Sequence, residues 1–433
     1  MAPAGPCPEA RRGIWPGALW DNRPVEQGLD HRRRGRYMDV ADVRARFSSL
    51  RSGFTFLDAP GGTQVPDEVG LATARNYQEA SGNIGFPYET SRRIAAVVDG
   101  ARTAAAGFLG CRTDEIVFGA NMTSLNFTLS RTVGRTLRPG DEIITTRLDH
   151  DANVAPWLEL ARDNDLVIRE VDVRSDTTLD VADLERLLSG RTRIVAFPWA
   201  SNAVGTTVDA GEICALAHDA GALAWIDAVQ YAPHLPIDVR AVDADVLLCS
   251  SYKFCGPHLG IAYGRQDLLE SWRPYKARPV GMDPVGHRFE TGTLPYELLA
   301  GLVATFEYLD SLGGIKDLAV WERALGERLL AGLPAAARLY GPASMEGRVP
   351  TFLLNFDGIS SAELSVRLAE RGFGVWSGDN YYALGLHERI DWGDALRVGL
   401  THYNTLEEVD RFNEVLAELV SSYRGSPSKA DDA

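Results

Sequence analysis

Cysteine is scarce in this sequence, and its distribution argues against two kinds of structure. The five cysteines, Cys7, Cys111, Cys214, Cys249 and Cys255, show no C-x-x-C spacing and no pairing with histidine, and none follows residue 255. An odd number of scattered thiols in a long chain is typical of a reduced, cytoplasmic protein. We therefore expect neither a disulfide framework nor a metal site.

Long apolar runs and an excess of positive charge are also missing. No run of about 18 apolar residues occurs, so we expect no transmembrane helix and no membrane partner. The net charge of −15 argues against binding to nucleic acid, which would require a basic face. The chain does have 45% hydrophobic and 24% charged residues over 433 positions, which is typical of a globular protein with one large and one small domain.

The first part of the chain differs in composition from the rest. Residues 1–37 are rich in Pro, Gly and Arg, carry a basic cluster at 31–36, and lack the apolar core of a signal peptide. A helical pattern begins at Met38, so we expect that Met38 is the natural start or that 1–37 is a disordered extension. A functional arm is the alternative. Residues 423–433 are predicted to be a disordered tail.

Short apolar strands alternate with helical patterns between residues 100 and 265. The predicted strands are 115–118, 142–146, 167–171, 193–197, 222–226, 246–249 and 260–263, and one of the helices between them is expected at 125–137. Such alternation predicts an α/β fold with a mainly parallel sheet flanked by helices. Ligands bind such sheets at the carboxyl ends of the strands.

The pattern changes after residue 300. Helices are expected at 301–312, 321–330, 361–371 and 406–419, and strands at 351–356, 374–376 and 396–400. This mixture predicts a smaller C-terminal α+β domain at 301–422. We then expect residues 61–300 to form the large ligand-binding domain and residues 38–60 to form an N-terminal segment that packs with the small domain.

Two charged residues stand at the ends of neighbouring predicted strands. Asp227 follows strand 222–226, and Lys253 follows strand 246–249. A lysine can carry pyridoxal 5'-phosphate (PLP) as a Schiff base, and an acid can keep the pyridine nitrogen of PLP protonated. A surface lysine beside a strand-end carboxylate is the ordinary alternative for this pair.

Other strand ends carry residues suited to the same cofactor. The segment 119–126 precedes a predicted helix, where free backbone N–H groups and the helix dipole can bind a phosphate. His150 can stack on a cofactor ring and transfer protons, Asn202 supplies an amide, and Gln230 can donate to the ring hydroxyl. An N-cap for the segment 119–126 and a structural role for His150 are the alternatives.

Several short motifs in a fixed order carry a family resemblance. They are Asp149–Asn153, Ser201–Thr206, Asp227–Gln230 and Ser250–Lys253, with Leu57–Pro66, Phe289–Thr293 and Arg397–Asp410 around them. Together they resemble class V aminotransferase-fold PLP enzymes, and most of all the cysteine-desulfurase-like branch. The resemblance runs from about residue 50 to 420 and implies the PLP-dependent transferase fold type I.

The resemblance implies a role for each matching residue. Lys253 would form the Schiff base and move the Cα proton, Asp227 would pair with the pyridine nitrogen, and His150 would stack on the ring. The other expected cofactor contacts are Gln230 to the ring hydroxyl; Thr123, Met122, Ser250 and Tyr252 around the phosphate; Asn202; and Thr293 from a neighbouring subunit. Asn202 and Arg397 would bind the carboxylate of a small amino-acid-like substrate. A homodimer with shared active sites follows from the role of Thr293.

Two departures from the family pattern bear on the reaction. Tyr252 stands where desulfurases have histidine, although its hydroxyl can still bond a phosphate. The segment 376–384, which matches the loop that carries the persulfide-forming cysteine, contains no cysteine. Tyr381 and Tyr382 stand there instead, as possible acid catalysts or as packing residues.

The missing thiol decides among the reactions open to PLP. Persulfide transfer needs a cysteine nucleophile, so we expect a C–S lyase or a related β-eliminating enzyme. An epimerase or an aminotransferase of specialised metabolism is the alternative. A non-catalytic protein with a PLP fold is a further alternative.

Overall fold

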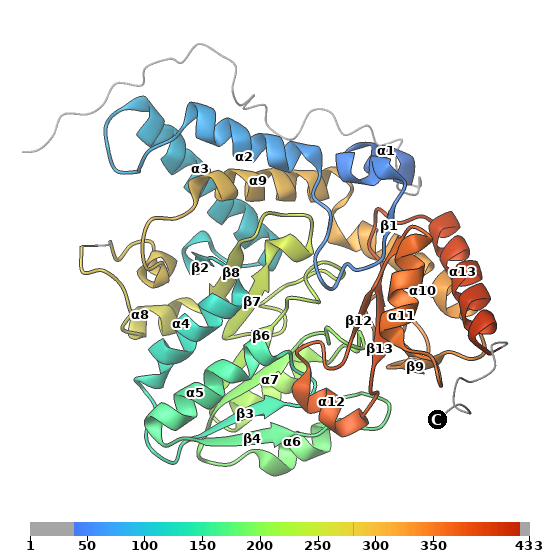
Figure 1. The fold of residues 1–433 in the computed structure, drawn as a ribbon. Coiled ribbons are helices and arrows are strands. Elements are labelled where there is room, and N and C mark those ends of the chain that lie inside the picture. The colour runs from blue at the N-terminus through green and yellow to red at the C-terminus, as the bar shows by residue number, and fades with distance from the viewer. Residues whose placement is uncertain (1–38, 280, 425–433) are drawn as a thin grey trace, which may run out of the picture. The chain divides into compact units, whose positions relative to one another are not determined.

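The computed structural model describes residues 39–279 and 281–424 (Figure 1). The described residues belong to one compact unit. The predictions of disorder for 1–37 and for most of the tail fall outside the described residues. Helix α13 (Leu406–Arg424) continues into the first two residues of the segment 423–433.

A seven-stranded sheet forms the centre of the molecule, in the order β2-β8-β7-β6-β5-β3-β4. Its strands are β2 (Ile116–Gly119), β3 (Glu142–Thr146), β4 (Val167–Val171), β5 (Thr192–Pro198), β6 (Leu223–Asp227), β7 (Val246–Ser250) and β8 (Gly260–Gly264). Neighbours from β7 to β4 pair in parallel, whereas β8 is antiparallel to both β7 and β2. The predicted mainly parallel sheet is confirmed, and the register aligns Pro198 with Asp227 and Asp227 with Leu248.

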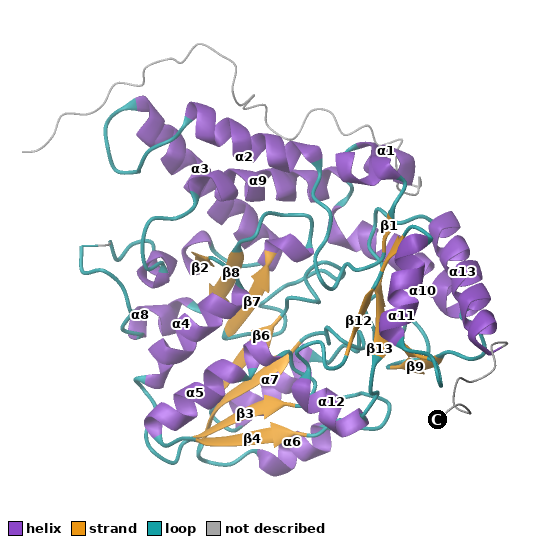
Figure 2. Cartoon of the chain, viewed as in Figure 1, coloured by secondary structure: helices purple, strands orange, loops and turns teal. Residues whose placement is uncertain are grey.

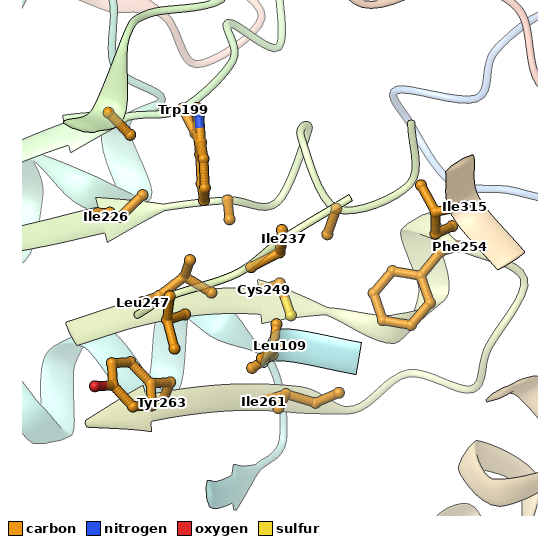
Figure 3. Packing of buried hydrophobic residues seen from close by; sticks show 14 of the residues in the cluster. Leu109, Trp199, Ile226, Ile237, Leu247, Cys249, Phe254, Ile261, Tyr263 and Ile315 are labelled. Carbon is orange, nitrogen blue, oxygen red and sulfur yellow. The ribbon is translucent and has the colours of Figure 1, made fainter. Parts of the chain in front are cut away.

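Helices cover both faces of this sheet (Figure 2). They are α3 (Glu89–Leu109), α4 (Met122–Gly134), α5 (Ala155–Asn164), α6 (Val181–Leu187), α7 (Ala210–Asp219), α8 (Gln266–Ser271) and α9 (Tyr296–Ser311), and α2 (Asp67–Glu79) packs on α9. On one face, Leu247 and Ile261 pack near Leu109 of α3 (Figure 3). On the other, Trp225 meets Trp157 of α5 edge to face, with ring centroids 4.8 Å apart. Strands buried on both faces explain the nearly continuous apolar runs in the sequence.

A second, four-stranded sheet of order β12-β13-β10-β9 is antiparallel throughout. Its strands are β9 (Arg338–Tyr340), β10 (Thr351–Asn355), β12 (Trp376–Gly378) and β13 (Ala395–Gly399), and α10 (Gly314–Gly332), α11 (Ser361–Glu370), α12 (Leu384–Ile390) and α13 accompany it. The first α-helix and the first strand of the described residues are α1 (Val40–Ala45) and the short β1 (Thr55–Phe56). The domain boundaries given above remain predictions.

The prediction of a single strand at 374–376 is wrong, because the structure has two short strands in this region. Strand β11 (Phe373–Gly374) pairs in parallel with β1, whereas β12 pairs with β13. The two halves have different partners, and a bridge between Asp58 and Gly399 places the N-terminal segment next to the four-stranded sheet.

Three helices begin earlier than their apolar patterns predict, and one of them is α10, which starts at Gly314 rather than Trp321. Helix α4 starts at Met122 rather than Leu125, because the Asn121 side chain accepts the Ser124 N–H at 2.8 Å and caps the first turn. Helix α9 starts at Tyr296, directly after Pro295. No single helix of the described segments is long and apolar enough to cross a membrane; α9 and α10 meet that criterion only as a pair bent by 65°.

Candidate active site

A cavity of about 570 Å³ opens at the carboxyl ends of β5, β6 and β7. It reaches the loops that flank β12 and the side chain of Arg397 on β13. The residues expected at the site that line the cavity are Met122, Thr123, His150, Asn202, Asp227, Gln230, Ser250, Tyr252, Lys253 and Arg397. Ten side chains from distant parts of the sequence therefore meet in one place.

Lys253 lies at the end of the short helical turn that follows β7, and its side chain is 8% exposed. Its Nζ donates to the backbone oxygens of Pro60 and Gly61, the second at 3.1 Å. Burial, reinforced by the positive charge of Arg397, lowers the pKa of Lys253 from 10.5 to about 7. The amine is therefore largely unprotonated just above neutral pH and available as a nucleophile.

Asp227 is the last residue of β6 and is buried. Burial raises the pKa of its carboxyl from 3.8 to about 6, while the Val229 N–H, 2.8 Å from Oδ1, and nearby Lys253 oppose the shift. No arginine or lysine side chain of the described residues forms an ion pair with it. A buried carboxylate without such a partner favours a cationic ligand beside it. Gln230 points its Nε2 to Pro60 O at 3.0 Å.

The first turn of α4 approaches the end of β7. The Met122 N–H donates to Ser250 Oγ at 2.9 Å, and Thr123 is exposed to the cavity. Gly260 permits this approach, because a Cβ there would lie 2.4 Å from the Asn121 carbonyl carbon. Free N–H groups and hydroxyls at the N-terminus of a 13-residue helix form a site suited to phosphate.

His150 is fixed in one tautomer. Its Nδ1 accepts the Ala152 N–H at 3.0 Å, so the ring proton must reside on Nε2. Burial, together with the charges of Lys253 and Arg397, lowers the pKa of His150 to about 4. The imidazole is therefore neutral at physiological pH and offers a hydrogen-bond donor, and protonating it would break the Ala152 contact.

Arg397 and Asn202 have polar atoms left unpaired by the protein. Arg397 Nη1 donates to Asn202 O at 3.1 Å and Nη2 lies 3.7 Å from Asp58 Oδ1, but its buried Nε has no partner among the described residues. Asn202 Nδ2 donates to Tyr381 O at 2.7 Å, which leaves Oδ1 buried and unpaired there. The sequence analysis did not identify Asp58 as a partner of Arg397, although this residue belongs to the Leu57–Pro66 motif.

The segment 379–383 lies against the large sheet. The Asp151 N–H donates to Tyr382 O at 2.7 Å, and Tyr382 stacks on His150 with ring centroids 5.3 Å apart. Helix α12 follows directly, and its Arg389 Nε lies 2.9 Å from Asp172 Oδ1. The segment that matches the desulfurase cysteine loop is thus held in a defined position.

Thr293 is the one expected site residue that does not line the cavity. It is exposed, three residues after Glu290. Glu290 is buried and binds Arg102 Nη2 with both oxygens, at 2.7 and 2.6 Å, and also accepts the Phe118 N–H. Part of the motif Phe289–Thr293 therefore has a structural role, and the contact of Thr293 with a second subunit remains a prediction.

The residues of this cavity fit PLP. The buried amine of Lys253, the unpaired acid Asp227 and the helix terminus at Met122 match the aldehyde, the pyridine nitrogen and the phosphate of that cofactor. The orphaned Nε of Arg397 supplies a donor for an anionic group. The described residues hold no cluster of three potential metal ligands. These features define a PLP-dependent enzyme of fold type I.

Comparison with known proteins gives the family. The family model for class V aminotransferases matches residues 55–412, so this chain belongs to the class V aminotransferase family. It is 32% identical to a probable cysteine desulfurase 2 of Mycobacterium leprae over 401 residues, which cover 86% of this chain and 95% of that protein. It is also 32% identical to the aminotransferase-like protein FGM3 of Gibberella zeae, over 86% of this chain and 96% of that protein.

A solved structure supports the cysteine-desulfurase-like branch of this family. The apo cysteine desulfurase of Thermococcus onnurineus NA1 superposes with a TM-score of 0.84 at 26% identity, covering 89% of this chain and 99% of that one. The predicted fold type I, the cofactor PLP and the cysteine-desulfurase-like branch of the family are thereby confirmed.

Proposed function

We propose that this protein is a C–S lyase that acts on an S-substituted cysteine or a closely related amino acid. The net reaction breaks the Cα–H and Cβ–S bonds, returns a proton to the departing sulfur, and converts substrate and water into a thiol, pyruvate and ammonium. The observation that carries the proposal is the lack of a thiol at the cavity. None of the four described cysteines lines it, and Cys255 is buried.

The remaining thiols are also poor nucleophiles. Burial, together with nearby acids, raises the pKa of Cys111 and of Cys214 to about 12, and burial raises the pKa of Cys249 further. A thiol with a raised pKa contains little thiolate at neutral pH. A persulfide-forming route therefore has no support, and a leaving group that departs without a protein nucleophile is favoured.

PLP supplies the electron sink that stabilises negative charge at Cα once the proton has left. Lys253 would hold the cofactor, and its free amine would accept the Cα proton. Asp227 holds the pyridine nitrogen protonated, which its buried position favours because the two charges then compensate each other. Arg397 would bind the substrate carboxylate through Nε, the guanidinium nitrogen that has no partner among the described residues.

The protein residues also limit the choice of acid catalyst. Tyr381 OH donates to the carbonyls of Ala395 and Trp376 at 2.7 and 3.0 Å, and burial raises its pKa above the ordinary 10. His150, whose Nδ1 is occupied by the Ala152 N–H, would stack on the cofactor ring and would offer Nε2–H as a hydrogen-bond donor. Lys253 then returns the proton that the departing sulfur needs.

The state of assembly and the location are also proposals. A cytoplasmic homodimer, in which Thr293 of one subunit contacts the phosphate in the other, accounts for the exposed position of Thr293. An epimerase or aminotransferase remains the second candidate, because the same proton abstraction at Cα by Lys253 begins each of these reactions.

One experiment separates these functions. Purified holoenzyme is incubated with cysteine, cystine and S-substituted cysteines, and pyruvate and released thiol are measured in parallel. The lyase predicts pyruvate and thiol in equal amounts, and their loss in Lys253→Ala along with the visible absorbance of lysine-bound cofactor. Racemisation in deuterated water without pyruvate, or keto-acid formation that requires a second substrate, would contradict the proposal.

A further inference from the structure

Two aromatic side chains at the edge of the cavity are only partly covered by protein. Trp376 on β12 is 45% exposed, and Tyr382 is 63% exposed. Both line the cavity that holds Lys253 and Arg397. Exposed aromatic surface of this size gains free energy when an apolar group covers it, so a ligand that reaches this edge would be stabilised there.

The backbone of Tyr382 is held in place, and its ring stacks on His150 with ring centroids 5.3 Å apart. Tyr381 and Tyr382 both have positive φ, +51° and +60°, a conformation that costs about 1–2 kcal/mol per non-glycine residue. Their carbonyls accept hydrogen bonds from Asn202 Nδ2 and the Asp151 N–H, each at 2.7 Å. Strained backbone that the surroundings hold in place is a feature of binding and catalytic sites.

Trp376 is held in a similar way on the other side. The guanidinium of Arg397 lies over its ring at 5.1 Å and over the ring of Tyr381 at 4.6 Å. Tyr381 in turn meets Trp376 edge to face, with ring centroids 6.3 Å apart. Since Arg397 is the carboxylate-binding residue of the proposed function, the Trp376 ring lies close to the bound substrate.

Few charged side chains line the cavity. The acidic and basic side chains that line it, histidine apart, are Asp227, Lys253 and Arg397, each less than a tenth exposed. A substrate whose carboxylate binds Arg397 would therefore have these rings beside its side chain rather than further ions. The nearest charge, Arg397, would repel a cationic side chain.

We propose that Trp376 and Tyr382 form a specificity site for a substrate whose side chain carries an aromatic or heteroaromatic ring. The inference rests on the proposed function only in assuming an α-amino acid whose carboxylate is bound by Arg397. It goes further by assigning the class of side chain. Tyr382 contributes the face of its ring, and its hydroxyl is not required.

The test uses amino acids that have no leaving group on Cβ, so that binding is measured apart from elimination. Dissociation constants of the holoenzyme for L-phenylalanine, L-cyclohexylalanine, L-norleucine and L-lysine are obtained by calorimetry. We expect L-phenylalanine to bind about two- to tenfold more tightly than L-cyclohexylalanine, its saturated analogue of similar shape, since ring pairs contribute that much beyond area. L-Lysine is expected to bind more weakly than either.

Variants then show which side chains cause the preference for L-phenylalanine. Trp376→Leu and Tyr382→Leu are expected to reduce the phenylalanine preference to about onefold, whereas Tyr382→Phe keeps it, because only the hydroxyl is lost. Tyr275→Leu is the matched control, because Tyr275 is an exposed ring that packs on Arg135 at 3.7 Å and does not line the cavity. Thermal unfolding verifies that each variant is folded.

Three results would overturn the inference: an unchanged preference in both leucine variants, tighter binding of L-lysine than of L-phenylalanine, or equal losses in Tyr382→Phe and Tyr382→Leu. The two proposals fail separately. Selective binding of L-phenylalanine without pyruvate formation would support the specificity site and contradict the lyase function. Pyruvate formation without ring selectivity would support the lyase function and contradict the specificity site.

Discussion

The two walls of the cavity differ in how their polar groups are satisfied. The cofactor wall, formed by Met122, Asp227, Ser250 and Lys253, contains a buried acid and a buried amine whose pKa values are shifted to about 6 and about 7. In the loop wall, formed by Trp376, Tyr381, Tyr382 and Arg397, the tyrosine carbonyls and the Tyr381 hydroxyl are bonded within the protein, while the buried Nε of Arg397 has no partner among the described residues. The cofactor wall thus consists of ionisable groups whose charges are disfavoured by burial, whereas the loop wall is held mainly by hydrogen bonds and ring contacts.

The largest effect that would test this contrast concerns Lys253. Its pKa of about 7, in place of 10.5, makes its amine roughly 300-fold more abundant in neutral form at pH 8 than that of an ordinary lysine. Because the pKa is lowered, PLP uptake by the apoprotein should accelerate as pH rises through about 7 and then level off. Visible absorbance after mixing measures the rate, with free lysine as control. A rate that still climbs between pH 8 and pH 10 would contradict a depressed pKa.

The next effect concerns the support behind the cofactor wall. Glu290→Ala leaves Arg102, 4% exposed, without its ion-pair partner. Breaking a buried pair in this way costs about 3–5 kcal/mol of folding free energy, which urea unfolding at pH 7 would show. Glu363→Ala removes the exposed partner of Arg367 and serves as a control with no measurable change. Equal stability of the two variants would show that the buried pair is not a support.

Asp227→Asn should separate stability from activity. Because the pKa of Asp227 is raised in the folded apoprotein, its ionised form costs about 3 kcal/mol at pH 8. Asparagine removes that cost, so the apo variant should be more stable than wild type at pH 8, with a difference that shrinks as pH falls through about 6. Activity should fall strongly. Thermal unfolding of apo and holo forms measures both, and a variant less stable at pH 8 would disprove the assignment.

The smallest effect belongs to the loop wall. Tyr381→Phe removes the hydroxyl that bonds the carbonyls of Ala395 and Trp376, at a cost of about 1 kcal/mol. PLP uptake should not change, because Tyr381 does not face the cofactor groups. Urea unfolding and the uptake assay together measure this, with Tyr382→Phe as the neighbouring control. Impaired PLP uptake in Tyr381→Phe would show that the cofactor wall depends on the loop wall, and would contradict the contrast.

The sequence predicted the cofactor wall well and the loop wall poorly, for physical reasons. Asp227 and Lys253 stand at strand ends, and apolar runs mark strand ends clearly. The positive φ of Tyr381 and Tyr382 could not be predicted, since tyrosine rarely adopts this conformation. Long-range partners such as Asp58 and Arg397 also escape any local pattern, as does the antiparallel direction of β8.

The salt bridge between Arg389 of α12 and Asp172 has a consequence for how the enzyme would respond to its medium. Both side chains are 42% exposed, and dissolved ions screen exposed charges over about 8 Å at physiological ionic strength. Concentrated salt would therefore weaken the attachment of α12, which follows the segment 379–383, while the cofactor wall, shielded by burial, would be little affected. Ionic strength would then act on the loop wall and leave cofactor retention constant.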